Sequence, residues 1–226
     1  MDIIKDYIPQ GRNNRRGVKM IPKWITCHDT ANVSTGADAA SHGRYLKGDV
    51  AAKIPVSWHF TVSDKNIVQH LPLNESGYHA GDGPSGPGNR QSIGVEICED
   101  AGGDRQKAEA LAVELIVYLI KTEKSLHPFP ACVKQHFDWS GKNCPRAIRR
   151  RPNGWKNFLA EVEKKLTTPD QVLPKVDRRL EGTANGKPVT VDAYLINGLT
   201  YVPLRIIGEA LGAKVWGDGR KYSIDK

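Results

Sequence analysis

Apolar residues recur with two different periods along the first 167 residues of the chain. Helical spacing is clearest within residues 105–124, where the apolar positions include Ala108, Leu111, Ala112, Leu115 and Leu119. Further apolar residues widen this face enough for the helix to lie on a sheet. Short β-prone runs occur instead at residues 24–28, 57–62, 66–69 and 92–98, and the second and third are predicted to pair around a polar turn. Strands that alternate with helices indicate an α/β fold.

One further helix is predicted before the first paired strands. Ser34 and Thr35 have side-chain oxygens that can accept hydrogen bonds from the first helical turn. We expect them to cap a helix that runs to about Lys47 and ends at Gly48, because glycine is favoured at helix C-termini.

A domain boundary is predicted near residue 168. Residues 157–166 carry apolar side chains at helical spacing and are expected to form a closing helix. Pro169 and Pro174 bracket the polar stretch that follows, which cannot continue that helix. We therefore expect a domain over residues 1–167, a linker over residues 168–174 and a small α+β module over residues 175–226.

The composition is that of a globular protein of one or two domains. Of the 226 residues, 39% are hydrophobic and 26% charged. The longest apolar run, Leu115 to Ile120, is far shorter than the roughly twenty residues that a membrane span requires. The N-terminal sequence MDIIKDYIPQGRNNRRG contains no apolar signal-peptide core. We expect a protein without a transmembrane segment and without a secretory signal peptide.

The net charge of +8 favours anionic partners. Nucleic acid, anionic wall polymers and a membrane surface would all fit, and a simply solvated surface is the alternative. A basic run stands at Arg146, Arg149, Arg150 and Arg151. Because no recognised nucleic-acid-binding motif accompanies this run, we do not expect a nucleic-acid partner.

Three residues have side chains that suit zinc. The segment QHFDWSGKNCP contains His136 and Cys144, and His28 ends a predicted strand. Two imidazoles and one thiolate with an open position are typical of a catalytic zinc site. Strand alternation sends Cys27 to the face opposite His28, where a small hydrophobic role is expected. None of the four cysteines forms a CxxC pair, and thiols or metal ligands are expected rather than disulfides.

Glu96 and Lys142 could supply the chemistry beside such a metal. Glu96 interrupts the apolar strand SIGVEIC, where a carboxylate is costly unless it is paired or near a metal. It could then act as a proton acceptor, and the alternative is a water-facing carboxylate on an edge strand. Cys98 lies on the same predicted face and would be a fourth ligand in another reading. Lys142 could stabilise a developing oxyanion, or it could be an ordinary solvated lysine.

These residues belong to segments that together resemble the type 2 N-acetylmuramoyl-L-alanine amidases, above all those of phage endolysins and prophage autolysins acting on Gram-positive walls. The segments are IPKWITCHDTAN, SWHFTV, HLPLNESGYHAG, SIGVEIC and QHFDWSGKNCP, in order over about residues 1–166. The resemblance implies a central mixed β-sheet flanked by helices, shared with peptidoglycan-recognition proteins. It also implies one zinc ion on His28, His136 and Cys144, with Glu96 and Lys142 catalytic.

The resemblance extends to the substrate groove. His79 in YHAG matches a histidine that lines the groove, and Trp58 stands where some relatives have a catalytic tyrosine. Tryptophan cannot act as an acid or base, which leaves the group that protonates the leaving amine open. The implied activity is hydrolysis of the lactyl–L-alanine amide bond of peptidoglycan, by a protein that is made in the host cytoplasm and acts on the cell wall after release. The alternatives are a non-catalytic peptidoglycan-binding protein and a zinc peptidase acting within the stem peptide.

The tail is less informative. Residues 175–226 resemble the small module named after the N-terminal domain of copper amine oxidases, with turns predicted at NGK and INGLTY and a helix over residues 204–211. The tail contains no His and no Cys, so a copper site is not expected. Wall binding is one expectation, by analogy with endolysins that carry a separate binding domain. A stability or dimerisation role is the other.

Overall fold

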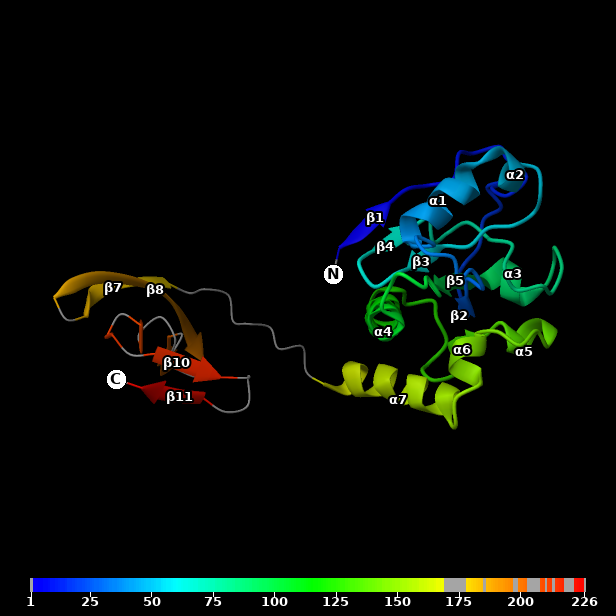
Figure 1. The fold of residues 1–226 in the computed structure, drawn as a ribbon. Helices are drawn as coiled ribbons and strands as arrows, with labels where there is room; N and C mark the ends of the chain where they lie inside the picture. The colour runs from blue at the N-terminus through cyan, green and yellow to red at the C-terminus, as the bar shows by residue number, and fades with distance from the viewer. Residues whose placement is uncertain are drawn as a thin grey trace. The chain divides into compact units, whose positions relative to one another are not determined.

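The computed structural model divides into two compact units, Met1–Pro169 and Asp170–Lys226 (Figure 1). It describes residues 2–168, 178–184, 186–196, 199–202, 208–209, 211–212, 214–217 and 222–225. The first unit contains β1 (Ile3–Lys5), β2 (Trp24–Asp29), α1 (Ala39–Lys47), α2 (Asp49–Ala52), β3 (Phe60–Val62), β4 (Ile67–Gln69), α3 (Pro87–Gln91), β5 (Ser92–Ile97), α4 (Arg105–Thr122), β6 (Val133–Gln135), α5 (Phe137–Ser140), α6 (Arg146–Arg149) and α7 (Gly154–Thr167).

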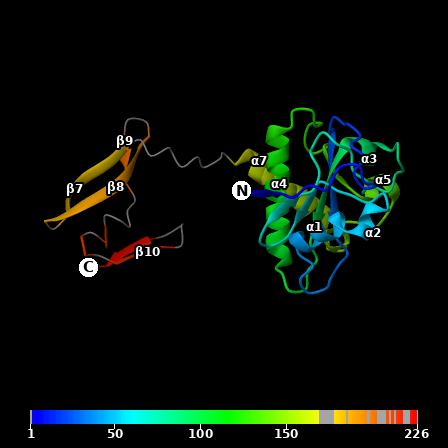
Figure 2. The same ribbon diagram turned by 90° about the horizontal axis from the view of Figure 1, so that it is seen from above.

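The six strands of this unit form one mixed sheet in the order β1-β4-β3-β5-β2-β6. Strands β3 and β4 are antiparallel neighbours, as the turn between them predicts, and the other neighbours are parallel. In Figures 1 and 2, α4 and α7 lie on one side of the sheet and α1 and α2 on the other. The predicted α/β architecture, a mixed sheet flanked by helices, is confirmed.

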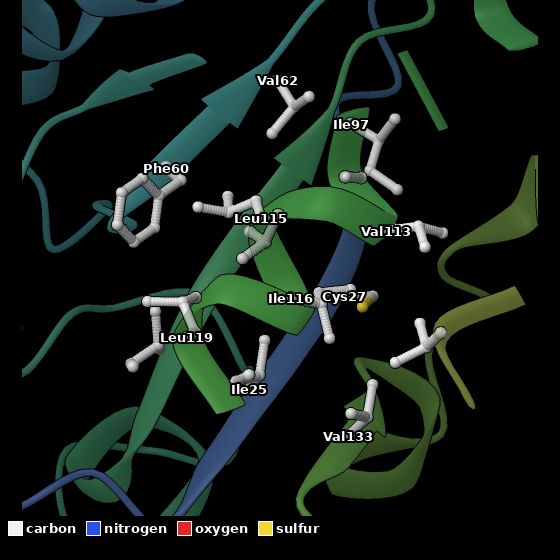
Figure 3. Close-up of a cluster of buried hydrophobic side chains, with 14 of the residues drawn as sticks. Ile25, Cys27, Phe60, Val62, Ile97, Val113, Leu115, Ile116, Leu119 and Val133 are labelled. Carbon is white, nitrogen blue, oxygen red and sulfur yellow. The ribbon is translucent and has the colours of Figure 1, made fainter. Parts of the chain in front are cut away.

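The main core lies between the sheet and α4. Leu115, Ile116 and Leu119 of α4 are fully buried and reach the apolar side chains of the strands (Figure 3). Cys27 is buried in the same cluster, which confirms that it packs as a small hydrophobe on the face opposite His28. A smaller buried cluster includes Leu46 of α1 and consists of Ile8, Leu46, Trp58 and Leu71.

The predicted start of α1 is wrong. The helix begins at Ala39, and its N-cap is Asp38, whose carboxylate accepts a hydrogen bond from the backbone of Ser41 at 2.8 Å. An aspartate at this position satisfies a first-turn N–H that has no partner within the helix, so the residues before it turn instead of continuing the helix. The predicted end at Gly48 is confirmed.

The second unit is described in part. It contains β7 (Arg178–Ala184), β8 (Lys187–Ile196) and β9 (Leu199–Tyr201) in one antiparallel sheet, and β10 (Lys214–Gly217) paired antiparallel with β11 (Tyr222–Asp225). Gly186 has φ +75° in the turn between β7 and β8, where NGK predicts one. Most of the linker, most of the helix predicted over 204–211 and the centre of the INGLTY turn lie outside the described residues. No helix in the described part of the chain is both long and apolar enough to span a bilayer.

Candidate active site

Strand pairing places His28 and Glu96 side by side. β2 and β5 run parallel, and in their register His28 is the partner of Glu96. Because side chains alternate along a strand, both point to the face opposite the main core. The Glu96 Oε1 atom lies 3.9 Å from the His28 Nδ1 atom. The two residues thus share one end of the sheet.

The second histidine arrives on the neighbouring strand. β6 pairs with β2 so that Cys27 and Gln135 are partners, and His136 follows directly. The backbone N–H of His136 donates to the Cys27 carbonyl at 3.2 Å. This extension of the strand pairing brings the His136 Nδ1 atom to 2.9 Å from the His28 Nδ1 atom.

Cys144 returns to the same point through α5 and the loop that follows. Its carbonyl accepts a hydrogen bond from Phe137 at 3.1 Å, and its Sγ atom accepts one from the backbone N–H of Asp29 at 3.3 Å. The Sγ atom lies 3.9 Å from the His28 Nδ1 atom. One ligand atom from each of His28, His136 and Cys144 lies within 4.8 Å of the others, and all three residues are buried.

The three ligand atoms fit a zinc ion. Bond lengths of about 2.0–2.3 Å in a tetrahedral site place neighbouring N and S ligands roughly 3.3–3.6 Å apart, close to the separations seen here. Each ring also has a second partner: the His28 Nε2 atom contacts His79, and the His136 ring interacts with the backbone of Ala80. Each Nδ1 atom can therefore present its lone pair to a shared cation. The structure thus brings together the three side chains that the sequence proposes as metal ligands.

The electrostatics of the cluster favour neutral imidazoles. Burial, followed by the neighbouring imidazoles, lowers the pKa of His28 well below its ordinary value, and burial lowers that of His136 to about 4. Burial, followed by the charge of Glu96, raises the pKa of the Cys144 thiol to about 12. A cation bound here would oppose that rise, because the thiolate is the form that binds metal.

Glu96 lies in the interior of the sheet, so the alternative of a water-facing carboxylate on an edge strand is wrong. β5 has β3 on one side and β2 on the other. Burial raises the pKa of Glu96 to about 8, and its Oε2 atom is buried without a hydrogen-bond partner in the described residues. An unpaired carboxylate oxygen beside three metal-type ligands is suited to hold a water molecule or to accept a proton.

A cleft of about 680 Å³ opens over this cluster. Its walls include all the residues proposed from the sequence: Trp58, His79, Glu96, Lys142 and the three metal-type ligands. Lys142 is exposed there, whereas the Trp58 Nε1–H donates to the Thr61 hydroxyl at 2.7 Å. Cys98 is not part of the ligand cluster among the described residues.

Sequence reasoning missed the residue that anchors the end of β2. The Asp29 carboxylate accepts a hydrogen bond from Arg105 at 2.5 Å and another from the backbone N–H of Ala147 at 2.6 Å. It thereby ties β2 to the start of α4 and to α6. The adjacency of an acidic residue to His28 was the available signal, but its two partners are distant in sequence. Arg16 and Tyr78 also line the cleft, and the sequence analysis proposes neither, although Tyr78 precedes His79 in the YHAG segment.

A second hollow of about 780 Å³ lies along α4 and α7 and has different chemistry. Its basic side chains pair with acidic residues: Arg151 with Glu109 at 2.6 Å and Lys165 with Glu114 at 2.7 Å. Two further members of the basic run have partners: Arg146 pairs with Glu99 at 3.3 Å, and Arg149 stacks over the Phe137 ring. The unpaired buried oxygen of Glu96 distinguishes the cleft from this hollow.

Comparison with known proteins agrees with this geometry. The family model for N-acetylmuramoyl-L-alanine amidases matches residues 18–147, and that for the copper amine oxidase N-terminal domain matches residues 181–225. Among curated proteins, the chain is 52% identical over 163 residues to the N-acetylmuramoyl-L-alanine amidase XlyA of Bacillus subtilis, covering 72% of this chain and 51% of XlyA. It is 46% identical over 172 residues to CwlH of the same organism, covering 76% of this chain and 65% of CwlH.

Solved structures give the same result. The catalytic domain of XlyA superposes with a TM-score of 0.66 at 51% identity, covering 72% of this chain and 99% of that domain. PlyL superposes with a TM-score of 0.62 at 33% identity, covering 72% of this chain and 97% of PlyL. The chain spans about half the length of XlyA. With its first unit matched by the family model and by these structures, the chain belongs to the N-acetylmuramoyl-L-alanine amidase family.

Proposed function

We propose that residues 1–167 hydrolyse the amide bond between the lactyl group of N-acetylmuramic acid and L-alanine in peptidoglycan, with one zinc ion held by His28, His136 and Cys144. The observation that carries this proposal is the convergence of those ligand atoms beside the unpartnered Glu96 oxygen in an open cleft. Family membership supports the choice of bond.

Zinc bound at these ligands would supply Lewis-acid polarisation of the scissile carbonyl and a lower pKa for water. In this proposal Glu96 takes the proton of the attacking water. One carboxylate oxygen lies 3.9 Å from the His28 Nδ1 atom, and the other has no hydrogen-bond partner among the described residues. The exposed ammonium of Lys142 at the cleft wall is available to stabilise negative charge that develops on the carbonyl oxygen.

Trp58 has a different task from an acid or base. Its indole N–H is already donated to Thr61, and its ring packs with the cluster around Leu46. We infer that Trp58 supplies an apolar wall to the cleft and that another group protonates the leaving amine.

The biological setting is also part of the proposal. XlyA and CwlH are both named N-acetylmuramoyl-L-alanine amidases. For this chain we propose the role of a phage or prophage lysin that acts on a Gram-positive wall. The positive charge would favour attachment to anionic wall polymers. For residues 175–226 we propose attachment to the wall, with a role in stability or self-association as the other outcome of a deletion experiment.

Analysis of digested wall tests the activity. The purified protein should release free α-amino groups on L-alanine without creating reducing sugar ends. The Glu96→Gln variant, tested in parallel, controls for contaminating hydrolases. New termini inside the stem peptide would support a peptidase instead, reducing ends would indicate a glycosidase, and wall binding without new termini would indicate a non-catalytic binding protein.

A further inference from the structure

His79 lies behind the candidate metal site and contacts one of its ligands. Its Nδ1 atom is 3.0 Å from the His28 Nε2 atom, and its Nε2 atom is 3.3 Å from the backbone carbonyl of Ser92. The side chain is almost completely buried, with 8% of the residue exposed. Both ring nitrogens are therefore engaged inside the protein, which leaves the carbon edge of the ring for the cleft.

The surrounding backbone is built around this ring. A Cβ atom on Gly94 would lie 2.8 Å from the His79 ring, so β5 can carry only a glycine at this point without displacing it. A Cβ atom on Gly77 would lie 3.1 Å from the same ring. On the other side, the buried Asn89 accepts hydrogen bonds through Oδ1 from the backbone N–H groups of His79 and Ala80, at 2.7 and 2.8 Å. These contacts fix the position of the imidazole.

The hydrogen bonds of His79 determine which nitrogen carries its proton. A neutral imidazole has one N–H group and one ring nitrogen that accepts a hydrogen bond. The Ser92 carbonyl can only accept, so the His79 Nε2 atom donates to it. The His79 Nδ1 atom must then accept a hydrogen bond.

The same reasoning extends to His28. If the His79 Nδ1 atom accepts, the His28 Nε2 atom must donate, because the two nitrogens are 3.0 Å apart. A neutral His28 with its proton on Nε2 has its lone pair on Nδ1. That atom is the one that faces His136 and Cys144.

We propose that His79 is a positioning residue: as the middle member of a Ser92–His79–His28 chain of hydrogen bonds, it holds His28 in the tautomer and orientation that present Nδ1 to the metal. This inference rests on the proposed zinc site. Metal-bound histidines commonly donate their second N–H to a carboxylate, a carbonyl or water, and loss of such a partner typically weakens metal binding about 10- to 100-fold. Here the imidazole of His79 is the acceptor, and its own orientation is fixed by its hydrogen bond to the Ser92 carbonyl.

The test compares two substitutions of His79 with one matched control. His79→Leu removes the acceptor, whereas His79→Gln can in principle accept from His28 and donate to Ser92. His127→Leu removes an exposed histidine elsewhere in the domain and serves as the control. Zinc affinity is measured by competition with a chromophoric chelator, and nitrogen-15 NMR of the wild-type protein reports which nitrogen of His28 and of His79 carries the proton in the zinc-free form.

The proposal expects the Leu variant to bind zinc about 10- to 100-fold more weakly than the wild type, with the Gln variant recovering most of the affinity and the control unchanged. It also expects His28 and His79 to carry their protons on Nε2 in the wild type. A Leu variant with wild-type zinc affinity, or a His28 protonated on Nδ1, would overturn it. If the Leu variant does not fold, the Gln variant and the wild-type tautomers decide.

Failure of this proposal and failure of the proposed function are distinguishable. If the wild-type protein takes up no zinc, the zinc proposal is wrong, and the hydrogen-bond chain is judged by its tautomers alone. If the wild type binds zinc and the tautomers differ from those expected, the metal site stands and the role of His79 does not.

Discussion

The two faces of the β2–β5 pair differ in chemistry although the same strands build both. On one face, Cys27 lies opposite Val95, and both are fully buried among apolar side chains beneath α4. On the other face, His28 lies opposite Glu96. The apolar face gains stability from burial, whereas the polar face buries groups whose hydration is lost and must be replaced by specific partners. Substitutions on the first should therefore change stability, and substitutions on the second should change metal binding and turnover.

The largest difference between substitutions on the two faces is expected for Cys144→Ser. A neutral hydroxyl is a poor replacement for a thiolate, so the variant should lose both zinc and activity. Metal analysis of the purified protein and chelator competition measure this effect. Cys27→Ala is the matched control, because it removes a thiol from the apolar face and should retain zinc. A Cys144→Ser variant with wild-type zinc content would remove this cysteine from the site.

Glu96→Gln should separate chemistry from metal binding on the polar face. The amide keeps the shape of the side chain but cannot accept the proton, so turnover of soluble muropeptides should fall about 10²- to 10⁴-fold while zinc affinity stays within a few fold. Steady-state rates with zinc titration on the same samples measure both quantities. Glu163→Gln, an exposed change on α7, is the control. Unchanged turnover would assign the proton acceptor to another group.

On the apolar face, Leu115→Ala should act on stability alone. Leu115 is fully buried where α4 meets the sheet, and truncation of such a leucine costs about 2–5 kcal/mol. Denaturant unfolding measures the loss, with the exposed Lys107→Ala on the same helix as control. Zinc affinity of the folded variant should match that of the wild type. A variant that loses zinc affinity while folded would show that the two faces are coupled.

A smaller and pH-dependent effect is expected where a buried polar group has a full set of partners. Glu75 accepts two hydrogen bonds from Arg15, at 2.9 and 3.2 Å, and these bonds lower the pKa of the carboxyl below its ordinary value of 4.5. Glu75→Gln should cost about 1–3 kcal/mol of unfolding free energy at neutral pH, with turnover unaffected.

The sign of the pH dependence follows from the lowered pKa. Because the folded pKa lies below the unfolded one, the contribution of the charged carboxylate is complete above the unfolded pKa and is lost as the pH falls through the folded value. The difference in stability between the wild type and Glu75→Gln should therefore shrink as the pH falls below about 4.5. If this difference in stability does not change below about pH 4.5, the charge of Glu75 does not contribute to stability, and only the shape of its side chain does.

The local sequence pattern was sufficient to predict helices and strands that bury a regular set of apolar side chains. The helical period of residues 105–124 and the apolar run around Glu96 correspond to α4 and β5, because one apolar face or two buried faces leave a direct mark on the sequence. β1 has no such mark: it is three residues long, two of them are exposed, and it exists through parallel pairing with β4. The start of α1 depended on a single capping carboxylate.

The site was predictable as a set of residue types and not as an arrangement. His28, His136 and Cys144 have side chains that suit zinc, and strand alternation placed His28 opposite the core. The neighbour of each group could not be predicted, because His28 meets His79 across 51 positions and meets Cys144 across 116. The interior place of Glu96 required the strand order, which depends on how the whole sheet assembles.

β6 lies at the edge of the sheet, and this position affects when the proposed metal site forms during folding and how it opens afterwards. β6 is the last strand in the order of the sheet. The two proposed ligands that follow it, His136 and Cys144, are separated from His28 by more than a hundred positions. During synthesis, His28 would leave the ribosome long before its co-ligands, and the set is complete when this last strand docks. In the finished protein, detachment of β6 would carry His136 away from His28, because the pairing of β6 with β2 holds the two residues together. Zinc bound to all three side chains should oppose this detachment. It should therefore slow amide hydrogen exchange in residues 133–144 more than in the central strands.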